Sequence, residues 1–183
     1  MQDKFYNKTG FTLIELMVVI AIIGILSTIL YASFDVAKSQ SRDKVRMASL
    51  KELQLAIELY KAQNGVFPPQ GCAPSGGGWA GPGPQLSWGA TCDNYISGLV
   101  PDFLPALPRD PSQEMVNGKG FIYMTNAGGS AYKIMVHRSV ESLQVTSFDD
   151  KFARCPVVNG GSCPTIGSIA DIYGVYSTGA ESW

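Results

Sequence analysis

The 183-residue sequence has little of the chemistry on which most enzymes depend. It holds one histidine, His137, and none of its four cysteines follows a Cys-x-x-Cys spacing, so the usual zinc-ligand patterns are missing. The sequence also lacks a nucleophile elbow and a phosphate-binding glycine loop. We therefore expect a protein that is not an enzyme, with no catalytic residue, no metal ion and no cofactor.

The sequence also lacks an excess of charge of either sign. Fourteen Lys and Arg residues stand against 15 Asp and Glu residues, which gives a net charge of −1, and the two signs are interspersed. Proteins that bind the phosphates of nucleic acids cluster their basic residues. Nucleic acid is therefore not indicated as a partner of the single chain.

Proline is absent before Pro68, and Phe11–Tyr31 holds a single ionisable side chain, that of Glu15. Twenty-one residues at about 1.5 Å each form a helix of about 31 Å, which matches the hydrocarbon core of a bilayer. The core helix of a soluble domain is seldom so uniformly apolar. We therefore predict a membrane-spanning helix that begins at Phe11.

Glu15 is the anomaly of this stretch, because a carboxylate in a membrane helix costs about 2.5–3.5 kcal/mol and so calls for a partner. A small-residue break, Gly10, precedes the apolar run instead of following it, unlike in an ordinary secretory signal. Cleavage after Gly10 would create an α-amine on Phe11, four residues from Glu15. That amine is the partner we expect for the carboxylate.

The run Lys8–Leu26, KTGFTLIELMVVIAIIGIL, resembles the processing and helix signature of type IV pilins and type II secretion pseudopilins. The resemblance implies cleavage between Gly10 and Phe11 by a prepilin peptidase, and N-methylation of Phe11. It further implies that Glu15 neutralises the Phe11 amine of a neighbouring subunit in a filament. The sequence departs from many family members in having no proline in the later part of this helix.

Residues 34–64 switch to an amphipathic pattern, which predicts that one continuous helix extends to about residue 64. Asn64-Gly65 supplies a left-handed cap and Pro68-Pro69 prevents continuation. The apolar positions recur every three or four residues and form a stripe on which a sheet can pack. These positions are Met47, Leu50, Leu53, Ile57 and Tyr60.

Strand patterns appear only in the second half of the chain. Residues 120–125 and 131–137, separated by a glycine-containing turn, predict a hairpin, and residues 171–177 predict a third strand. In residues 131–137 alternation predicts a dry face and a wet face, with Lys133 and His137 on the wet one. We expect a three- or four-stranded antiparallel sheet over the helix stripe.

Residues 70–92 are rich in glycine and proline and predict an irregular loop without regular elements. Trp79 and Trp88 in this loop are expected to pack on the domain instead of serving as exposed binding residues. Asp149 and Asp150 are expected to be solvated turn acids; calcium binding is the alternative, although no EF-hand pattern is present.

The four cysteines allow three disulfide connectivities, and an oxidising location outside the membrane favours disulfides. We predict Cys72–Cys92 and Cys155–Cys163, because each bond would close a loop that has little apolar content of its own. In the chain-entropy view each bond contributes about 2–3 kcal/mol.

The sequence thus predicts an α+β fold: a long N-terminal α-helix, membrane-spanning in its first half and amphipathic in its second half, packed against a small antiparallel β-sheet. The expected parts are a leader peptide (1–10), a transmembrane and filament-core helix (11–33), its amphipathic continuation (34–64) and a disulfide-stapled head (65–183).

The function that the resemblance implies is that of a structural subunit of a type IV pilus. Its partners would be the lipid bilayer before assembly, the prepilin peptidase, a membrane assembly platform and further copies of itself. It would start as a single-pass precursor in the inner (cytoplasmic) membrane and end in an extracellular pilus filament. A type II secretion pseudopilin, or a minor tip pilin with an adhesive or DNA-binding role, is the alternative.

Overall fold

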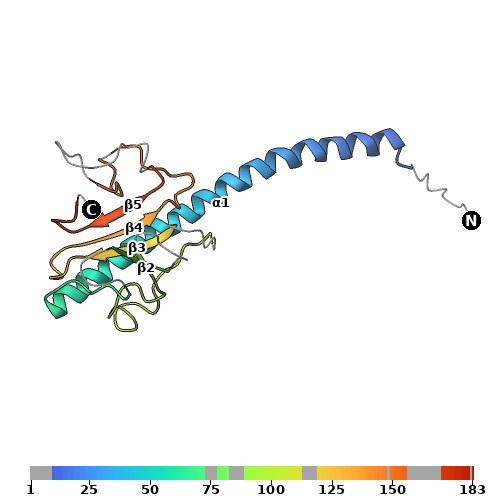
Figure 1. Ribbon diagram of the computed structural model, residues 1–183. Helices are drawn as coiled ribbons and strands as arrows, with labels where there is room; N and C mark the ends of the chain where they lie inside the picture. Colours follow the sequence, from blue (N-terminus) through green and yellow to red (C-terminus); the bar gives the residue numbers. More distant parts are fainter. Residues whose placement is uncertain are drawn as a thin grey trace, which may run out of the picture. The chain divides into compact units, whose positions relative to one another are not determined.

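The computed structural model describes residues 10–72, 78–82, 89–112, 119–147, 149–155, 170–181 and 183. The chain divides into two compact units, Met1–Lys38 and Ser39–Trp183. The described part of the first unit is helical from Leu13 onward, and the second unit contains the rest of that helix together with a β-sheet. Figure 1 shows these elements.

Helix α1 spans Leu13–Asn64 and has 52 residues. Its end follows the predicted pattern: Gly65 adopts a φ of 80°, and its amide donates to the Lys61 carbonyl at 2.8 Å. A left-handed residue directly after a helix satisfies a carbonyl of the last turn and turns the chain away. The side-chain amide of Asn64 donates a second hydrogen bond to a carbonyl of the last turn, that of Tyr60, at 2.9 Å.

The sheet has five strands in the order β2-β1-β3-β4-β5. The pairs β1–β3, β3–β4 and β4–β5 are antiparallel, and β2 pairs with β1 in parallel. The strands are β1 (Trp79–Gly81), β2 (Gly89–Thr91), β3 (Gly120–Thr125), β4 (Tyr132–His137) and β5 (Tyr173–Tyr176). The predicted hairpin is β3–β4 and the predicted third strand is β5, so the α+β class and the antiparallel sheet are confirmed.

The prediction that residues 70–92 form an irregular loop is wrong for β1 and β2. Each of these strands has only three residues, too few for an alternating pattern to show in the sequence. Gly81 explains how a glycine-rich segment joins the sheet: a Cβ there would lie 2.6 Å from the Phe121 carbonyl oxygen, so only glycine allows this approach.

One face of the sheet packs on the second half of α1, as the helix stripe predicts. Leu50, Leu53 and Ile57 are fully buried in this core, and burying each such side chain contributes about 1.5–3 kcal/mol. The sheet supplies the opposite wall of the same cluster. Its main buried side chains are Phe121, Tyr123, Tyr132, Ile134, Val136, Tyr173 and Val175.

The opposite face of the sheet is covered too, so the prediction of a wet face on β4 is wrong. Lys133 is fully buried and His137 is only 9% exposed. The Lys133 ammonium donates to three backbone oxygens, those of Ala180 (3.3 Å), Glu181 (3.0 Å) and Trp183 (2.9 Å). The C-terminal segment thus covers a lysine that alternation alone assigns to solvent. Trp79 packs with Ile122, Met135 and Ile172 in a second small apolar cluster on this sheet.

The disulfide Cys72–Cys92 is present, with its two Cα atoms 6.0 Å apart, so this predicted pairing is confirmed. Cys155 is also disulfide-bonded and buried. The second predicted pairing involves Cys163, which lies outside the described residues, as does Trp88. Cys155–Cys163 therefore stays a prediction.

Candidate assembly site

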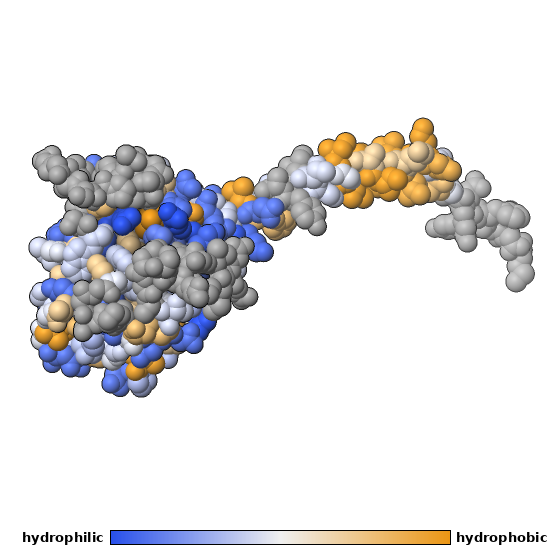
Figure 2. Space-filling model, viewed as in Figure 1, coloured by the Kyte–Doolittle hydropathy of each residue, from blue (hydrophilic) through white to orange (hydrophobic). Residues whose placement is uncertain are grey.

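The helix of the first unit is an apolar rod whose described side chains are all exposed. By its length and composition, the helix is long and apolar enough to cross a membrane. Figure 2 shows hydrophobic residues over this part of α1. Exposed apolar area on this scale marks a surface that meets lipid or protein. The most exposed of its apolar side chains are Leu13, Ile14, Ile20, Ile25 and Phe34.

Glu15 caps the N-terminus of this helix through hydrogen bonds with Thr12. The Glu15 carboxylate accepts the Thr12 amide at 2.8 Å and the Thr12 hydroxyl at 2.7 Å, and the Thr12 hydroxyl oxygen accepts the Glu15 amide at 3.3 Å. This reciprocal pattern is a capping box, which satisfies amides that a helix start leaves without partners. The Thr-x-x-Glu spacing is visible in the sequence, but we interpreted Glu15 only as a charge and missed it.

Gly10 and Phe11 precede the helix in backbone without regular secondary structure. Phe11 is 75% exposed, and a Cβ on Gly10 would meet no atom within 4 Å. Both residues lie within one helical turn of the Glu15 capping box in the sequence. The predicted cleavage and methylation residues therefore stand in open backbone, directly before the carboxylate that is expected to bind the new amine.

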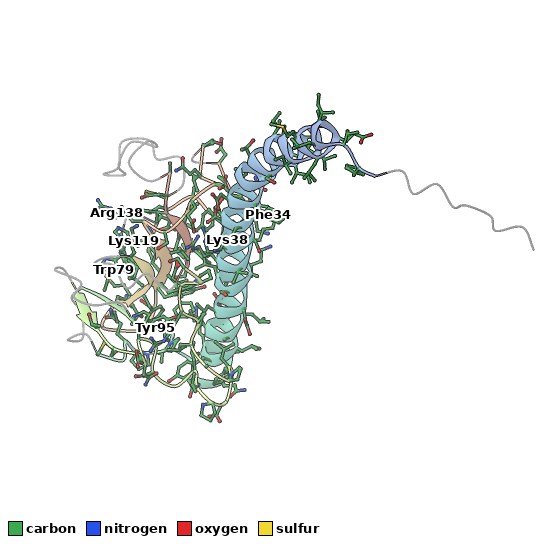
Figure 3. All side chains as sticks on the ribbon, turned by 90° about the vertical axis from the view of Figure 1, so that its right-hand side faces the viewer. Phe34, Lys38, Trp79, Tyr95, Lys119 and Arg138 are labelled. Carbon is green, nitrogen blue, oxygen red and sulfur yellow. A yellow bond between two sulfur atoms is a disulfide. The ribbon has the colours of Figure 1, made fainter. Side chains whose placement is uncertain are left out.

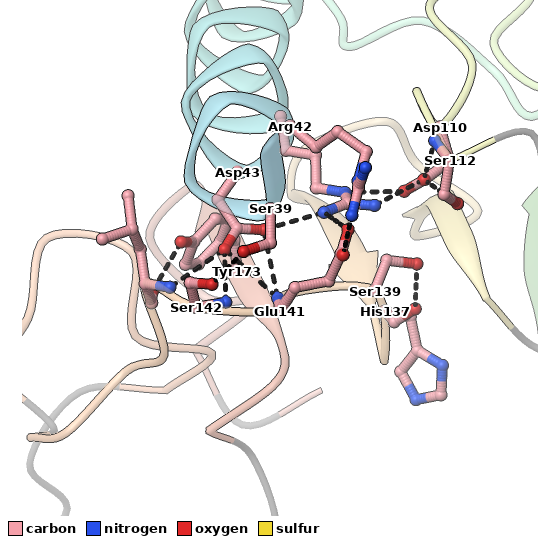
Figure 4. A network of polar contacts seen from close by, with 12 residues as sticks. Ser39, Arg42, Asp43, Asp110, Ser112, His137, Ser139, Glu141, Ser142 and Tyr173 are labelled. Atoms are coloured by element: carbon pink, nitrogen blue, oxygen red, sulfur yellow. Dashed lines mark hydrogen bonds and ion pairs between the residues drawn. The ribbon is translucent and has the colours of Figure 1, made fainter. Parts of the chain in front are cut away.

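A second polar group, in the second unit, joins α1 to the loops around the sheet. Arg46 is 1% exposed and donates to Asp43 (2.7 Å), Asp110 (2.7 and 2.9 Å) and Glu141 (2.8 Å). Figure 4 shows this network, in which Arg42 also binds Glu141. A buried charge is tolerated only when it is paired and hydrogen-bonded, and Arg46 meets both conditions.

Asp43 holds the loop that follows β4. Its carboxylate, fully buried, accepts the amides of Glu141 (3.1 Å), Ser142 (2.7 Å) and Leu143 (2.9 Å). These three amides and the Arg46 guanidinium together satisfy a carboxylate that would otherwise be buried at high cost. The loop after β4 is thereby fixed to one turn of α1.

The network changes the pKa of its acids. Hydrogen bonds from Arg42, and then from Arg46, lower the pKa of Glu141 to about 2, against the opposing effect of partial burial. For Asp110, burial would raise the pKa, but hydrogen bonds from Arg46 and Ser112 hold the pKa below its usual value. Both acids are therefore ionised at neutral pH, as their ion pairs require.

The sequence analysis missed this network, although a signal for it exists. Asp43 and Arg46 lie at the spacing of three and four residues that also relates Leu50, Leu53 and Ile57. They therefore fall on the buried stripe of α1, where a charged residue needs a partner. Charges that continue an apolar stripe are the pattern to look for.

Asp149 and Asp150 lie in a turn in the structure. The Asp150 carboxylate accepts the Phe152 amide at 3.1 Å, and the Asp149 amide donates to the Ser147 hydroxyl at 3.2 Å. Such short-range bonds are typical of Asp in turns. Within the described ranges, no group of three or more His, Cys, Asp and Glu residues is placed to hold a metal ion.

Comparison with known proteins bears on the first of these two regions. Residues 6–31 match the family described as the prokaryotic N-terminal methylation motif. The chain is similar to the type II secretion system core protein G of Vibrio cholerae, with 34% identity over 65 residues, which cover 36% of this chain and 44% of that protein.

It is also similar to the type IV wide pilus major component PilA4 of Thermus thermophilus (39% identity, covering 33% of this chain and 47% of PilA4). The fimbrial protein EcpC of Eikenella corrodens is 42% identical over 68 residues, which cover 36% of this chain and 43% of EcpC. The chain thus spans less than half the length of the curated relatives it matches. No solved structure gives a significant match.

The methylation motif, the relatives and the fold together support the type IV pilin-like family for this chain. Within that family, the relatives indicate a type IV pilin or a type II secretion pseudopilin, both of which are structural proteins.

Proposed function

We propose that this chain is the structural subunit of a type IV pilus. The observation that carries the proposal is the exposed apolar rod of α1, which holds one carboxylate, that of Glu15. This carboxylate lies four residues after Phe11, and Gly10 and Phe11 stand outside regular secondary structure. A rod of this kind serves first as a membrane anchor and then, once assembled, as the inner layer of a filament. In this proposal residues 1–10 are the leader, residues 11–33 are the membrane and filament-core helix, residues 34–64 continue that helix, and residues 65–183 form the head.

In the proposed sequence of events, a prepilin peptidase cleaves after Gly10 and the new Phe11 amine is methylated. The Glu15 carboxylate of one subunit then attracts the Phe11 amine of its neighbour, and this attraction is strong because surrounding hydrocarbon lowers the dielectric constant. In the single chain Thr12 occupies the Glu15 carboxylate, so the amine of the neighbour has to compete with Thr12. Close apolar packing supplies the rest of the association in lipid.

The partners that this proposal requires are other copies of the chain, the prepilin peptidase, the lipid bilayer and a membrane assembly platform. The chain would pass from the inner membrane to an extracellular fibre. The disulfides at Cys72–Cys92 and at Cys155 suit a head that works in an oxidising space.

A pseudopilin of type II secretion is the second candidate, because several relatives carry the name type II secretion system core protein G. Those matches cover about a third of this chain. A minor tip pilin with an adhesive or DNA-binding role is the remaining variant of the proposal. Electron microscopy and mass spectrometry of sheared surface fibres distinguish the three: a pilus subunit dominates the fibre mass, a tip pilin is a trace component, and a pseudopilin is absent.

The test of the carrying observation is Glu15→Ala, with Glu15→Gln beside it. We expect both variants to reach the membrane and to be cleaved, but to give few or no fibres, because neither offers a negative charge to the amine. Glu15→Gln keeps an oxygen for Thr12, so it separates loss of charge from loss of the helix cap. Normal fibres from Glu15→Gln would contradict the proposed pairing.

A further inference from the structure

The face of the sheet that does not pack on α1 contains a pocket of about 370 Å³. Gly78 and Trp79 line it from β1 and the residue before it, Met124 from β3, Met135 and His137 from β4, and Arg154 from the segment before β5. Figure 3 shows Trp79 and Arg138 on the side of the second unit opposite α1. Its volume is within the range of sites that bind small molecules.

The backbone of the segment that carries Arg154 packs closely on β5, which places Arg154 at the pocket. Gly174 in β5 donates its amide to the Phe152 carbonyl at 2.8 Å, and a Cβ on Gly174 would lie 3.0 Å from the Cα of Arg154. The missing side chain at Gly174 thus lets the segment that carries Arg154 approach the sheet. On either side of Arg154, Ala153 and Cys155 are buried, and Cys155 is disulfide-bonded.

Arg154 brings a positive charge, and no carboxylate in the described part of the chain pairs with it. None of the hydrogen bonds or ion pairs between described residues involves Arg154, and its Nε is a buried donor without a partner. Burial, and then the positive charge of Arg138, lower the pKa of Arg154.

The other charged groups around Arg154 are already engaged or have the same sign. The Lys133 ammonium is bound by three backbone oxygens of the C-terminal segment and lies 4.8 Å from the Tyr176 ring centroid. The carboxylate of Glu181 accepts the Gly179 amide at 2.8 Å. Arg138, exposed and at a φ of 50°, adds a second cation near the pocket.

We propose that this pocket binds a small carboxylate that carries a flat apolar body, with Arg154 holding the carboxylate and Trp79, Met124 and Met135 enclosing the apolar part. A guanidinium presents a fork of donors that matches the two oxygens of a carboxylate. Tryptophan offers a flat apolar surface, and the thioethers of methionine adapt to an aromatic ring. Inorganic phosphate satisfies only the cation and leaves the apolar wall without a contact.

The test uses isothermal titration calorimetry of the full-length chain in detergent micelles, with sodium benzoate and inorganic phosphate as separate probes. We expect benzoate to saturate one site with a Kd of about 0.1–1 mM, and phosphate to bind at least about tenfold more weakly. Arg154→Gln should weaken benzoate binding at least about tenfold. The matched control is Lys151→Gln, which removes an exposed cation from the same segment and should leave the Kd unchanged.

Trp79→Ala gives a second arm that leaves Arg154 in place. It should weaken benzoate binding several-fold and leave phosphate binding unchanged, so the proposal stays testable even if Arg154→Gln unfolds, which the thermal transition of each variant reveals. Equal effects of Arg154→Gln and Lys151→Gln, equal affinity for the two anions, or no saturable benzoate binding would each overturn the proposal. The result does not depend on whether fibres form.

Discussion

At the scale of single residues, Arg46 imposes the tightest constraint on the second unit. Its guanidinium is 1% exposed and binds three carboxylates, and the Asp43 carboxylate among them is fully buried. Removing one member of such a group leaves the others buried without their partner. The cost of that loss is much larger than the net contribution of the intact pairing.

We therefore predict that Arg46→Ala lowers the free energy of unfolding by about 3–5 kcal/mol. The matched control is Arg109→Ala, because Arg109 pairs with Asp93 where the two side chains are 52% and 79% exposed. An exposed pair contributes about 0–1 kcal/mol. Urea denaturation of the two variants measures the difference, and similar losses would contradict the structural role of the Arg46 network.

Glu141 makes the network sensitive to acid. Its folded pKa of about 2 lies below the ordinary value of 4.5, so its pairing adds stability above pH 4.5 and this contribution is lost as the pH falls toward 2. Because the side chain is 31% exposed, solvent screening reduces the contribution to about 1 kcal/mol.

Denaturation of the wild type between pH 5 and pH 2 should show this loss, and Glu141→Gln, already weaker at pH 7, should show a correspondingly smaller decrease. A wild type and a variant with the same pH dependence would show that the decrease comes from other acids.

At the scale of elements, the sequence predicts regular segments well when their pattern is long. The end of α1 follows from Asn64-Gly65 and Pro68, and the β3–β4 hairpin follows from two six-residue strands around a glycine turn. Strands β1 and β2 were missed because three residues carry no period. The wet face of β4 was wrong because the cover over Lys133 comes from residues near position 180, which strand alternation cannot reveal.

The residues of the candidate site also divide into those that the sequence reveals and those that only the structure reveals. Gly10, Phe11 and Glu15 follow from a contiguous motif, whereas the group around Arg46 joins residues up to 100 positions apart in the chain. Long-range ion pairs of this kind leave only an indirect mark in a sequence, here a charge on a buried stripe. The partner of that charge has to be found in the structure.

The Cys72–Cys92 bond should stabilise the segment that carries β1 and β2. It joins residues 20 positions apart, and a loop of that length corresponds to about 3 kcal/mol in the chain-entropy view. We predict this loss in the free energy of unfolding for the double variant Cys72→Ser and Cys92→Ser. Paired variants are needed because a reducing agent would also act on the bond at Cys155.

At the scale of the whole molecule, the two units differ in what holds them together. The second unit, Ser39–Trp183, contains both the helix stripe and the sheet that covers it, together with Asp43, Arg46 and their partners. The described side chains of the first unit's helix are exposed, and this helix is long and apolar enough to cross a membrane.

We predict that a fragment of residues 39–183 is soluble and unfolds in one cooperative transition. A fragment of residues 47–183 keeps Leu50, Leu53 and Ile57 but lacks Asp43 and Arg46, so its transition should lie well below that of the longer fragment. Circular dichroism during heating compares the two. Equal midpoints would mean that the apolar stripe alone holds the helix to the sheet.

The hydrogen bonds that Asp43 accepts from three successive amides also fix the orientation of the head on the second half of α1. With Arg46 holding Asp110 less than one turn further along, the head has no freedom to swivel around the helix within the second unit. In a fibre built as proposed, every head would keep one orientation to residues 39–64 of its own helix. Any feature on the head, the Arg154 pocket included, would then be presented at one fixed angle from that part of the helix.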